Sequence, residues 1–216
     1  MVALVVLGII AVINAMLIVV HTAGLEVSTI GSTRYVAATI AWLIPFLLLP
    51  YGILVNRHRY QVRKVEVSIP GLPKSLNGLT IVQISDIHSG SFFETQGFEK
   101  GVAIINSLDP DLIFFTGDLV NNRAIEFQRF VSTFKKMKAK YGIFSVLGNH
   151  DYGDYVPWKS KEAKKGNLEH LMEMQSSMGW RLLLNENEII EKEGNRIAVI
   201  GVENYSAKLR FPKYGD

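Results

Sequence analysis

The sequence predicts an α/β fold in which a parallel or mixed sheet is covered by helices. Short apolar and β-branched runs at residues 79–85, 112–116 and 143–147 have the length and composition of buried strands. Between these runs the apolar residues recur at helical spacing. The connections are short, which is typical of strands alternating with helices. The sequence therefore indicates a β-α-β-α-β core within the 216 residues.

The two helices of this core are indicated by their apolar faces. Residues 72–78, rich in Pro, Asn and Gly, are expected to turn the chain into the first strand. Phe98, Val102 and Ile105 follow at i, i+4 and i+7 and predict the first helix. A second helix, expected to end near residues 141–142, has one apolar stripe. That stripe consists of Phe127, Phe130, Val131 and Phe134.

The segments that flank the core have weaker patterns. Residues 65–69 alternate apolar and polar side chains, which predicts a strand with one face in water. After the core we expect a helix around 168–172 and an extended segment at 180–184. A hairpin turning at residues 194–195 would then lead into a last strand at 197–202.

The N-terminal part of the chain is much more apolar than the rest. Residues 2–20 and 36–55 carry no charge, and at about 1.5 Å per residue each run reaches roughly 30 Å, the thickness of a bilayer core. We therefore expect two transmembrane helices in a membrane region at 1–60, followed by a domain at 61–216. Buried core helices are the alternative for both runs. A cleaved signal peptide is the alternative for the first run, although no basic segment precedes it.

The positions of the charges indicate on which side of the membrane the domain lies, and the cysteine content limits the kinds of site. Basic residues follow the second apolar run, and such flanks stay on the cytoplasmic side; they are Arg57, Arg59, Arg63 and Lys64. The domain is therefore expected on the cytoplasmic side of the membrane. It has no cysteine, which excludes disulfides and thiolate metal sites.

The net charge of +3 is too small to indicate a nucleic-acid partner. The lysine-rich segments 135–140 and 159–165 are expected to be solvated helix faces. Attraction to an anionic membrane or substrate is the alternative interpretation of both segments.

Three short polar strings, about 30 residues apart, follow the three core strands. They are Asp86-Ile87-His88, Gly117-Asp118 and Gly148-Asn149-His150-Asp151. Because ligands collect at the carboxyl ends of parallel strands, we expect these strings to meet at one edge of the sheet. Carboxylate, imidazole and amide donors without sulfur suit Mn, Fe or Zn. A carboxylate between two such cations can bridge them, as in two-metal phosphoester hydrolysis.

With their flanking residues, the strings resemble the calcineurin-like metallophosphoesterase family, and the resemblance extends from residue 79 to about 202. They are most similar to its membrane-associated bacterial branch, which includes lipid-sugar pyrophosphatases. This resemblance implies that the protein lies in a bacterial inner membrane. The resemblance implies a layered α/β fold with two divalent metal ions. It also implies a first metal on Asp86 and His88, a bridging Asp118, and a second metal on Asn149. His150 would contact the phosphate and protonate the leaving oxygen, and Asp151 would orient His150.

The sequence departs from the family pattern after residue 151. The family completes its site with three further histidines, whereas the one histidine that follows His150 here is His170. His170 lies on a predicted amphipathic helix and is expected at its surface. We therefore expect a C-terminally truncated domain with an incomplete metal site, deficient catalysis and an exposed sheet edge.

The sequence-based hypothesis is a membrane-tethered, metal-dependent hydrolase of phosphoesters or pyrophosphates, with a lipid-linked substrate as one option. One alternative is a non-catalytic, membrane-bound binding or scaffold protein that keeps the fold. Another is a phosphodiesterase of soluble nucleotides. The expected partners are a phosphoester substrate and a membrane.

Overall fold

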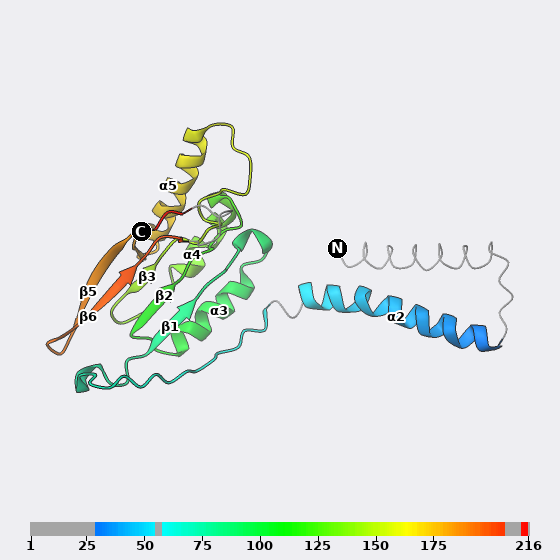
Figure 1. Cartoon of the computed structure of the whole chain (residues 1–216), viewed down its shortest axis with the longest axis horizontal. Helices are drawn as coiled ribbons and strands as arrows, with labels where there is room; N and C mark the ends of the chain where they lie inside the picture. Colours follow the sequence, from blue (N-terminus) through cyan, green and yellow to red (C-terminus); the bar gives the residue numbers. More distant parts are fainter. Residues whose placement is uncertain (1–28, 55–57, 206–212, 216) are drawn as a thin grey trace. The chain divides into compact units, whose positions relative to one another are not determined.

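The structure, a computed structural model, describes residues 29–54, 58–205 and 213–215 (Figure 1). The chain divides into two compact units, Met1–Lys64 and Val65–Asp216.

In the first unit, residues 29–54 form the helix α2 (Thr29–Leu54), which contains Pro45 and Pro50. The predicted span at 36–55 coincides with this helix up to Leu54, and the predicted span at 2–20 lies outside the described residues. Within residues 29–54, 58–205 and 213–215, no helix combines the length and the apolar character needed to cross a membrane.

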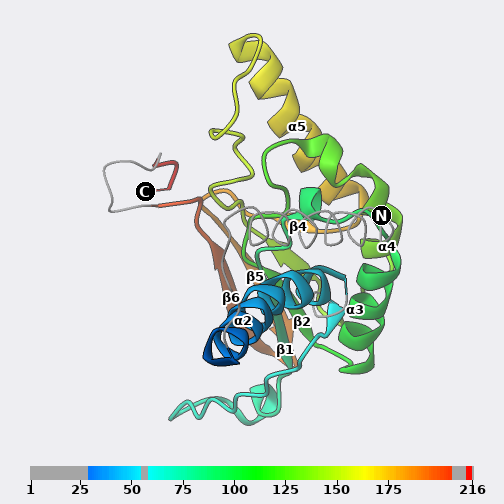
Figure 2. The same ribbon diagram turned by 90° about the vertical axis from the view of Figure 1, so that its right-hand side faces the viewer.

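The second unit contains a parallel sheet, a hairpin and three α-helices (Figures 1 and 2). The strands of the sheet are β1 (Ile81–Ile84), β2 (Leu112–Phe115), β3 (Ile143–Ser145) and β4 (Arg181–Leu182). The hairpin consists of β5 (Glu186–Lys192) and β6 (Asn195–Gly201). The helices are α3 (Gln96–Ser107), α4 (Val131–Phe134) and α5 (Lys161–Ser177). Short 3-10 turns are η2 (Lys74–Leu76), η3 (Ser89–Ser91), η4 (Ala124–Glu126) and η5 (Gln128–Phe130).

The four strands of the sheet are all parallel and lie in the order β1-β2-β3-β4. Ile84 at the end of β1 pairs with Phe115, which pairs with Ser145 and through it with Leu182. The carboxyl ends of all four strands therefore lie at one edge. The predicted α/β class and the β-α-β-α-β order are confirmed.

Two apolar cores cover the two faces of the sheet, and β2 contributes to both. Ile113 and Phe115 pack against side chains from α3, α4 and α5. Leu112 faces the other way and packs with the hairpin residues Ile190 and Val199. Because successive residues of a strand point to opposite faces, a central strand buried on both sides is apolar throughout. The domain is thus layered, with helices on one face of the sheet and the hairpin on the other.

The aromatic segment after β2 packs as expected but does not form the long helix that was predicted. It consists of η4, η5 and the single turn α4, which ends at Phe134. The rings of Phe98 and Phe130 are 4.7 Å apart, and those of Phe127 and Phe134 are 5.2 Å apart. Aromatic and β-branched residues are poor helix formers, so their packing decides the local backbone.

Two other predicted elements differ from the structure. The predicted strand at 65–69 is wrong, because in the described chain these residues are exposed and outside any strand; Val65 is 82% exposed and Val67 72%. An alternating apolar and polar pattern does not form a strand unless a neighbouring strand is available for pairing. The hairpin turn falls one residue earlier than predicted, at Glu193 and Gly194, which both have positive φ. Positive φ at both positions is typical of a two-residue type I′ turn.

Truncation of Leu171 should destabilise the domain strongly. Leu171 on α5 is fully buried in the core on the helical face of the sheet. Leu171→Ala should therefore lower the free energy of unfolding by about 2–5 kcal/mol, because it leaves a cavity. Ile200→Ala is the control, since Ile200 is 72% exposed; its effect should stay within about 0.5 kcal/mol. Urea unfolding of both variants checks this, and equal losses would contradict the described core.

Candidate metal centre

The loops that leave β1 and β2 run side by side beyond the strand ends. The backbone N–H of Asp86 donates to the carbonyl oxygen of Gly117 at 3.0 Å, and that of His88 donates to Asp118 at 3.1 Å. Asp86, His88 and Asp118 all have positive φ, at 54°, 45° and 59°. Non-glycine residues rarely adopt this conformation, and it is concentrated at functional sites.

The loops that leave β2 and β3 approach each other through two glycines. A Cβ atom on Gly117 would lie 2.6 Å from the Cα of Gly148. A Cβ on Gly148 would in turn collide with the backbone and the carboxylate of Asp118. Only glycine at these two positions lets the loops come this close.

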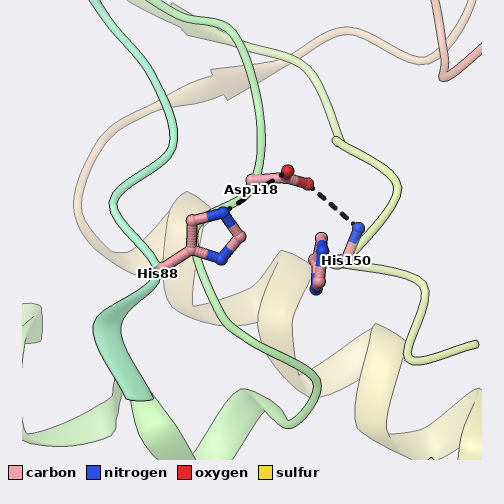
Figure 3. A group of neighbouring side chains, drawn as sticks. All are labelled: His88, Asp118 and His150. Carbon is pink, nitrogen blue, oxygen red and sulfur yellow. Dashed lines mark hydrogen bonds and ion pairs between the residues drawn. The ribbon is translucent and has the colours of Figure 1, made fainter. Parts of the chain in front are cut away.

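The three loops bring His88, Asp118 and His150 together (Figure 3). Each residue offers a ligand atom, and these atoms all lie within 4.8 Å of one another. His88 Nε2 is 3.7 Å from Asp118 Oδ2, and the two imidazole rings are 4.8 Å apart and nearly perpendicular. We call these three residues the triad.

Asp86 lies beside His88 of the triad, and Asn149 directly precedes His150 in the loop after β3. Asp86 Oδ1 lies 3.9 Å from His88 Nε2, and the other oxygen accepts a hydrogen bond from Ser85. The side-chain nitrogen of Asn149 donates to the hydroxyl of Tyr155 at 2.7 Å, which leaves its amide oxygen as the atom able to bind a cation. The ligand roles predicted for Asp86, His88, Asp118 and Asn149 stay predictions.

The imidazole of His150 is held by a backbone carbonyl. His150 Nδ1 lies 2.7 Å from the carbonyl oxygen of Asn121. Because a carbonyl only accepts, Nδ1 carries the hydrogen and the lone pair is on Nε2. The backbone N–H of His150 donates to Asp118 Oδ1 at 2.9 Å, and the ring of Tyr155 lies 4.6 Å away. The structure thus fixes the tautomer of His150 without any side-chain acid.

The side-chain hydrogen bonds of Asp151 go to backbone groups and not to the imidazole of His150, and its predicted role in orienting His150 stays a prediction. Its carboxylate is fully buried and accepts four backbone N–H groups, at 2.8 to 3.2 Å. These groups belong to Asp118, Leu119, Val120 and Gly148. Burial raises the pKa of the Asp151 carboxyl to about 7, and the N–H donors act in the opposite direction. Asp151 therefore joins the loop after β2 to the loop after β3.

Sequence reasoning missed three residues that shape this site. Asn121 and Tyr155 contact His150, as described. Glu126 accepts the backbone N–H groups of residues 121, 122 and 123, at 2.7, 3.3 and 3.1 Å, and so fixes the loop that carries Asn121. The available signals were weak: Asn121 lies in the loop after the Gly117-Asp118 string, and Glu126 lies three residues after Arg123.

The triad fits a divalent cation. His88 Nε2 lies within 4 Å of both Asp86 and Asp118, yet beyond hydrogen-bonding distance of either. Imidazole and carboxylate ligands lie about 2.0–2.2 Å from a metal such as zinc, so two ligands of one ion are typically about 3–4 Å apart. The donor chemistry agrees with first-row metals. His170 lies on α5, half-buried and 3.9 Å from Glu173, and is not part of this group.

Comparison with known proteins identifies the class. The family model for calcineurin-like phosphoesterases matches residues 79–210, which include the sheet, the hairpin and the triad. The chain therefore belongs to the calcineurin-like phosphoesterase family, and the family and its named members support a metal-using hydrolase.

The chain is also similar to individual proteins of this class. It is 28% identical to a transmembrane protein with metallophosphoesterase domain from Danio rerio, over 86% of this chain and 41% of the relative. It is 37% identical to the UDP-2,3-diacylglucosamine pyrophosphatase LpxG of Chlamydia trachomatis, over 59% of this chain and 39% of the relative. The chain thus spans less than half the length of these two relatives.

Among solved structures, the chain resembles the phosphopantetheinyl hydrolase PptH of Mycobacterium tuberculosis. The TM-score is 0.36 at 19% identity, over 57% of this chain and 42% of that one.

Asp151→Asn should destabilise the domain even without metal. The amide NH₂ cannot accept a hydrogen bond, so N–H donors would lose their acceptor in a buried place. We expect a loss of about 2–4 kcal/mol in the free energy of unfolding of the metal-free protein. Asp86→Asn is the matched control, because its side chain is 67% exposed. Urea unfolding measures both, and similar losses would show that the buried carboxylate has no special structural role.

Proposed function

We propose that the protein is a membrane-tethered hydrolase of phosphoesters or pyrophosphates with a dinuclear metal centre. One observation carries this proposal: His88, Asp118 and His150, from three successive strand exits, have ligand atoms within 4.8 Å of one another. Membership of the phosphoesterase family supports the reaction class.

The proposed ligands are Asp86 and His88 for one cation, Asp118 as the bridge, and Asn149 for the second. When bound, the cations would supply positive charge against the phosphoryl oxygens and a nucleophilic water at neutral pH.

The contact with Asn121 determines which ring nitrogen of His150 can take up a further proton. With its Nδ1–H directed at the carbonyl of Asn121, His150 has its free lone pair on Nε2. Protonated there, it would contact the substrate phosphate and give its proton to the leaving oxygen. The ring of Tyr155 packs against this imidazole, with the two ring centres 4.6 Å apart.

We further propose that the N-terminal region holds the domain at a membrane. The uncharged runs at 2–20 and 36–55 support this. Leu47, Leu48 and Leu49 on α2 are each more than 60% exposed. Consecutive helical residues point in different directions, so apolar surface extends around the helix, which suits a lipid environment. The relative from Danio rerio is named a transmembrane protein.

A catalyst held at a membrane meets amphiphilic substrates that rarely enter water, so we propose a lipid-linked phosphoester or pyrophosphate as the substrate. The similarity to LpxG, which is named a pyrophosphatase of a diacylated nucleotide sugar, supports this class. Hydrolysis of soluble nucleotides far faster than lipid pyrophosphates would contradict it.

Metal-dependent hydrolysis should require the triad. We expect the protein, expressed from its complete coding frame, to hydrolyse bis(p-nitrophenyl) phosphate with Mn²⁺ and to lose this activity with a chelator. Asp118→Asn and His150→Ala should each lower kcat/KM about 100-fold or more, since each removes a charge or proton donor from the site. Bound Mn²⁺, measured by metal analysis, should fall in Asp118→Asn.

His170→Ala is the control for these variants, because His170 lies on α5 away from the triad. It should keep both activity and bound metal. Full activity in Asp118→Asn and His150→Ala would end the hydrolase proposal and favour a binding or scaffold domain.

Attachment and sidedness can be tested together, because the chain has no cysteine of its own. The variant Ser132→Cys places one thiol at an exposed position of α4. The protein should stay in the membrane pellet after an alkaline wash. The thiol should react with a membrane-impermeant maleimide only after the cells are permeabilised, because basic flanks favour the cytoplasmic side. Labelling in intact cells would reverse the proposed topology, and release by the wash would exclude the tether.

A further inference from the structure

Two residues after Asn121, which contacts His150, Arg123 lies on the ring of Trp158. Its guanidinium carbon is 4.7 Å from the centre of the Trp158 ring, in a cation–π contact. The Arg123 backbone N–H is fixed by Glu126 Oε1 at 3.1 Å. The backbone N–H and the guanidinium of Arg123 therefore each have a partner, although the residue is exposed.

Trp158 is connected directly to the loop of His150. Trp158 Nε1 donates to the carbonyl oxygen of Gly153 at 2.7 Å, and the N–H of Gly153 donates to the carbonyl of His150 at 3.0 Å. On the other side, Asn121 contacts His150 and lies two residues before Arg123, a reach of at most about 7 Å. The Arg123–Trp158 pair thus belongs to the same rigid group of loops as the triad.

The charge of Arg123 is not neutralised within the protein. No carboxylate among the described residues lies within 4.0 Å of its guanidinium, and its one side-chain hydrogen bond, to the carbonyl of Pro157, is 3.5 Å long. Glu126 is near in sequence, but its oxygens accept three backbone N–H groups. An arginine that is held in place without an acid keeps its donors available for an anion from outside.

The surrounding segment adds positive charge. Residues 155–165 contain four lysines and one acid, Glu162. Lys164 pairs with Asp154, and Lys165 pairs with Glu169, whereas Lys159 and Lys161 are exposed. A local excess of one sign raises the concentration of oppositely charged ligands. This is the lysine-rich segment for which attraction to an anionic substrate was an open alternative.

We propose that Arg123, supported by Trp158, binds the second phosphate group of a diphosphate substrate whose first phosphoryl group lies at the triad. The proposal rests on the proposed function and narrows it, since it selects diphosphates over simple monophosphate esters. A guanidinium binds a phosphate through two parallel N–H···O bonds, which gives both affinity and orientation. Arg123 is then a specificity-determining residue rather than a metal ligand.

The test compares two substrates that differ by one phosphate, diadenosine diphosphate and diadenosine monophosphate. In the Mn²⁺-loaded, full-length protein, Arg123→Gln should lower kcat/KM for the diphosphate roughly 10- to 100-fold more than for the monophosphate, mainly through KM. Trp158→Leu, which removes the aromatic ring and keeps the charge, should give a smaller loss of the same kind.

Arg129→Gln is the matched control. Arg129 is also an exposed arginine in a cation–π contact, 5.5 Å from the Phe130 ring, and it lies outside the triad loops. Arg129→Gln should leave kcat/KM unchanged for both substrates. Equal losses on both substrates in Arg123→Gln, no loss at all, or the same loss in Arg129→Gln would overturn the subsite.

A binding measurement separates this proposal from the proposed function. If the wild type hydrolyses neither substrate, the proposed function fails, and titration of inorganic pyrophosphate into the metal-free protein decides the subsite. The wild type and Arg129→Gln should then bind pyrophosphate at least tenfold more tightly than Arg123→Gln. Absence of this difference would overturn the subsite as well.

Discussion

The geometry of the site depends on one buried carboxylate. Asp151 accepts backbone N–H groups from the start of one loop, at Gly148, and from a neighbouring loop, at residues 118–120. A carboxylate is costly to bury, and burial alone would favour its neutral form. Four converging donors offset that cost, so the two loops are stable only in the arrangement in which they share Asp151. The ligand atoms of Asp118 and His150 are placed by this arrangement.

The strain in the loops follows from the same constraint. Asp86, His88 and Asp118 have positive φ, and each such residue costs about 1–3 kcal/mol unless its surroundings enforce it. The surroundings here do so: the loop after β1 donates three backbone hydrogen bonds to the loop after β2, and Asp151 accepts N–H groups from that second loop. The strained backbone turns the three polar side chains away from the apolar cores and toward one another.

The sequence predicted the parts of the fold that periodicity and strand order determine, and it predicted where the polar strings meet. Parallel strands place their exits at one edge, so Asp86, Asp118 and His150 could be expected together. The hydrogen-bond partners of the Asp151 carboxylate could not be predicted in this way. Adjacency in the chain suggested His150, whereas in the folded loops four backbone N–H groups donate to Asp151. The strand expected at 65–69 failed for a related reason: pairing depends on a neighbour, which alternation does not reveal.

The loops of the site are held by contacts within the protein. The bonds that hold the loops run between protein groups: Asp151 with four N–H groups, Asn121 with His150, Glu126 with residues 121–123. His88 Nε2 is left 3.7 Å from Asp118 Oδ2 and 3.9 Å from Asp86 Oδ1, too far for a hydrogen bond to either. A site built in this way does not need to order its ligands during binding, which lowers the cost of binding. The same loops carry Arg123, so a substrate held at the metals and at the guanidinium would contact one rigid surface.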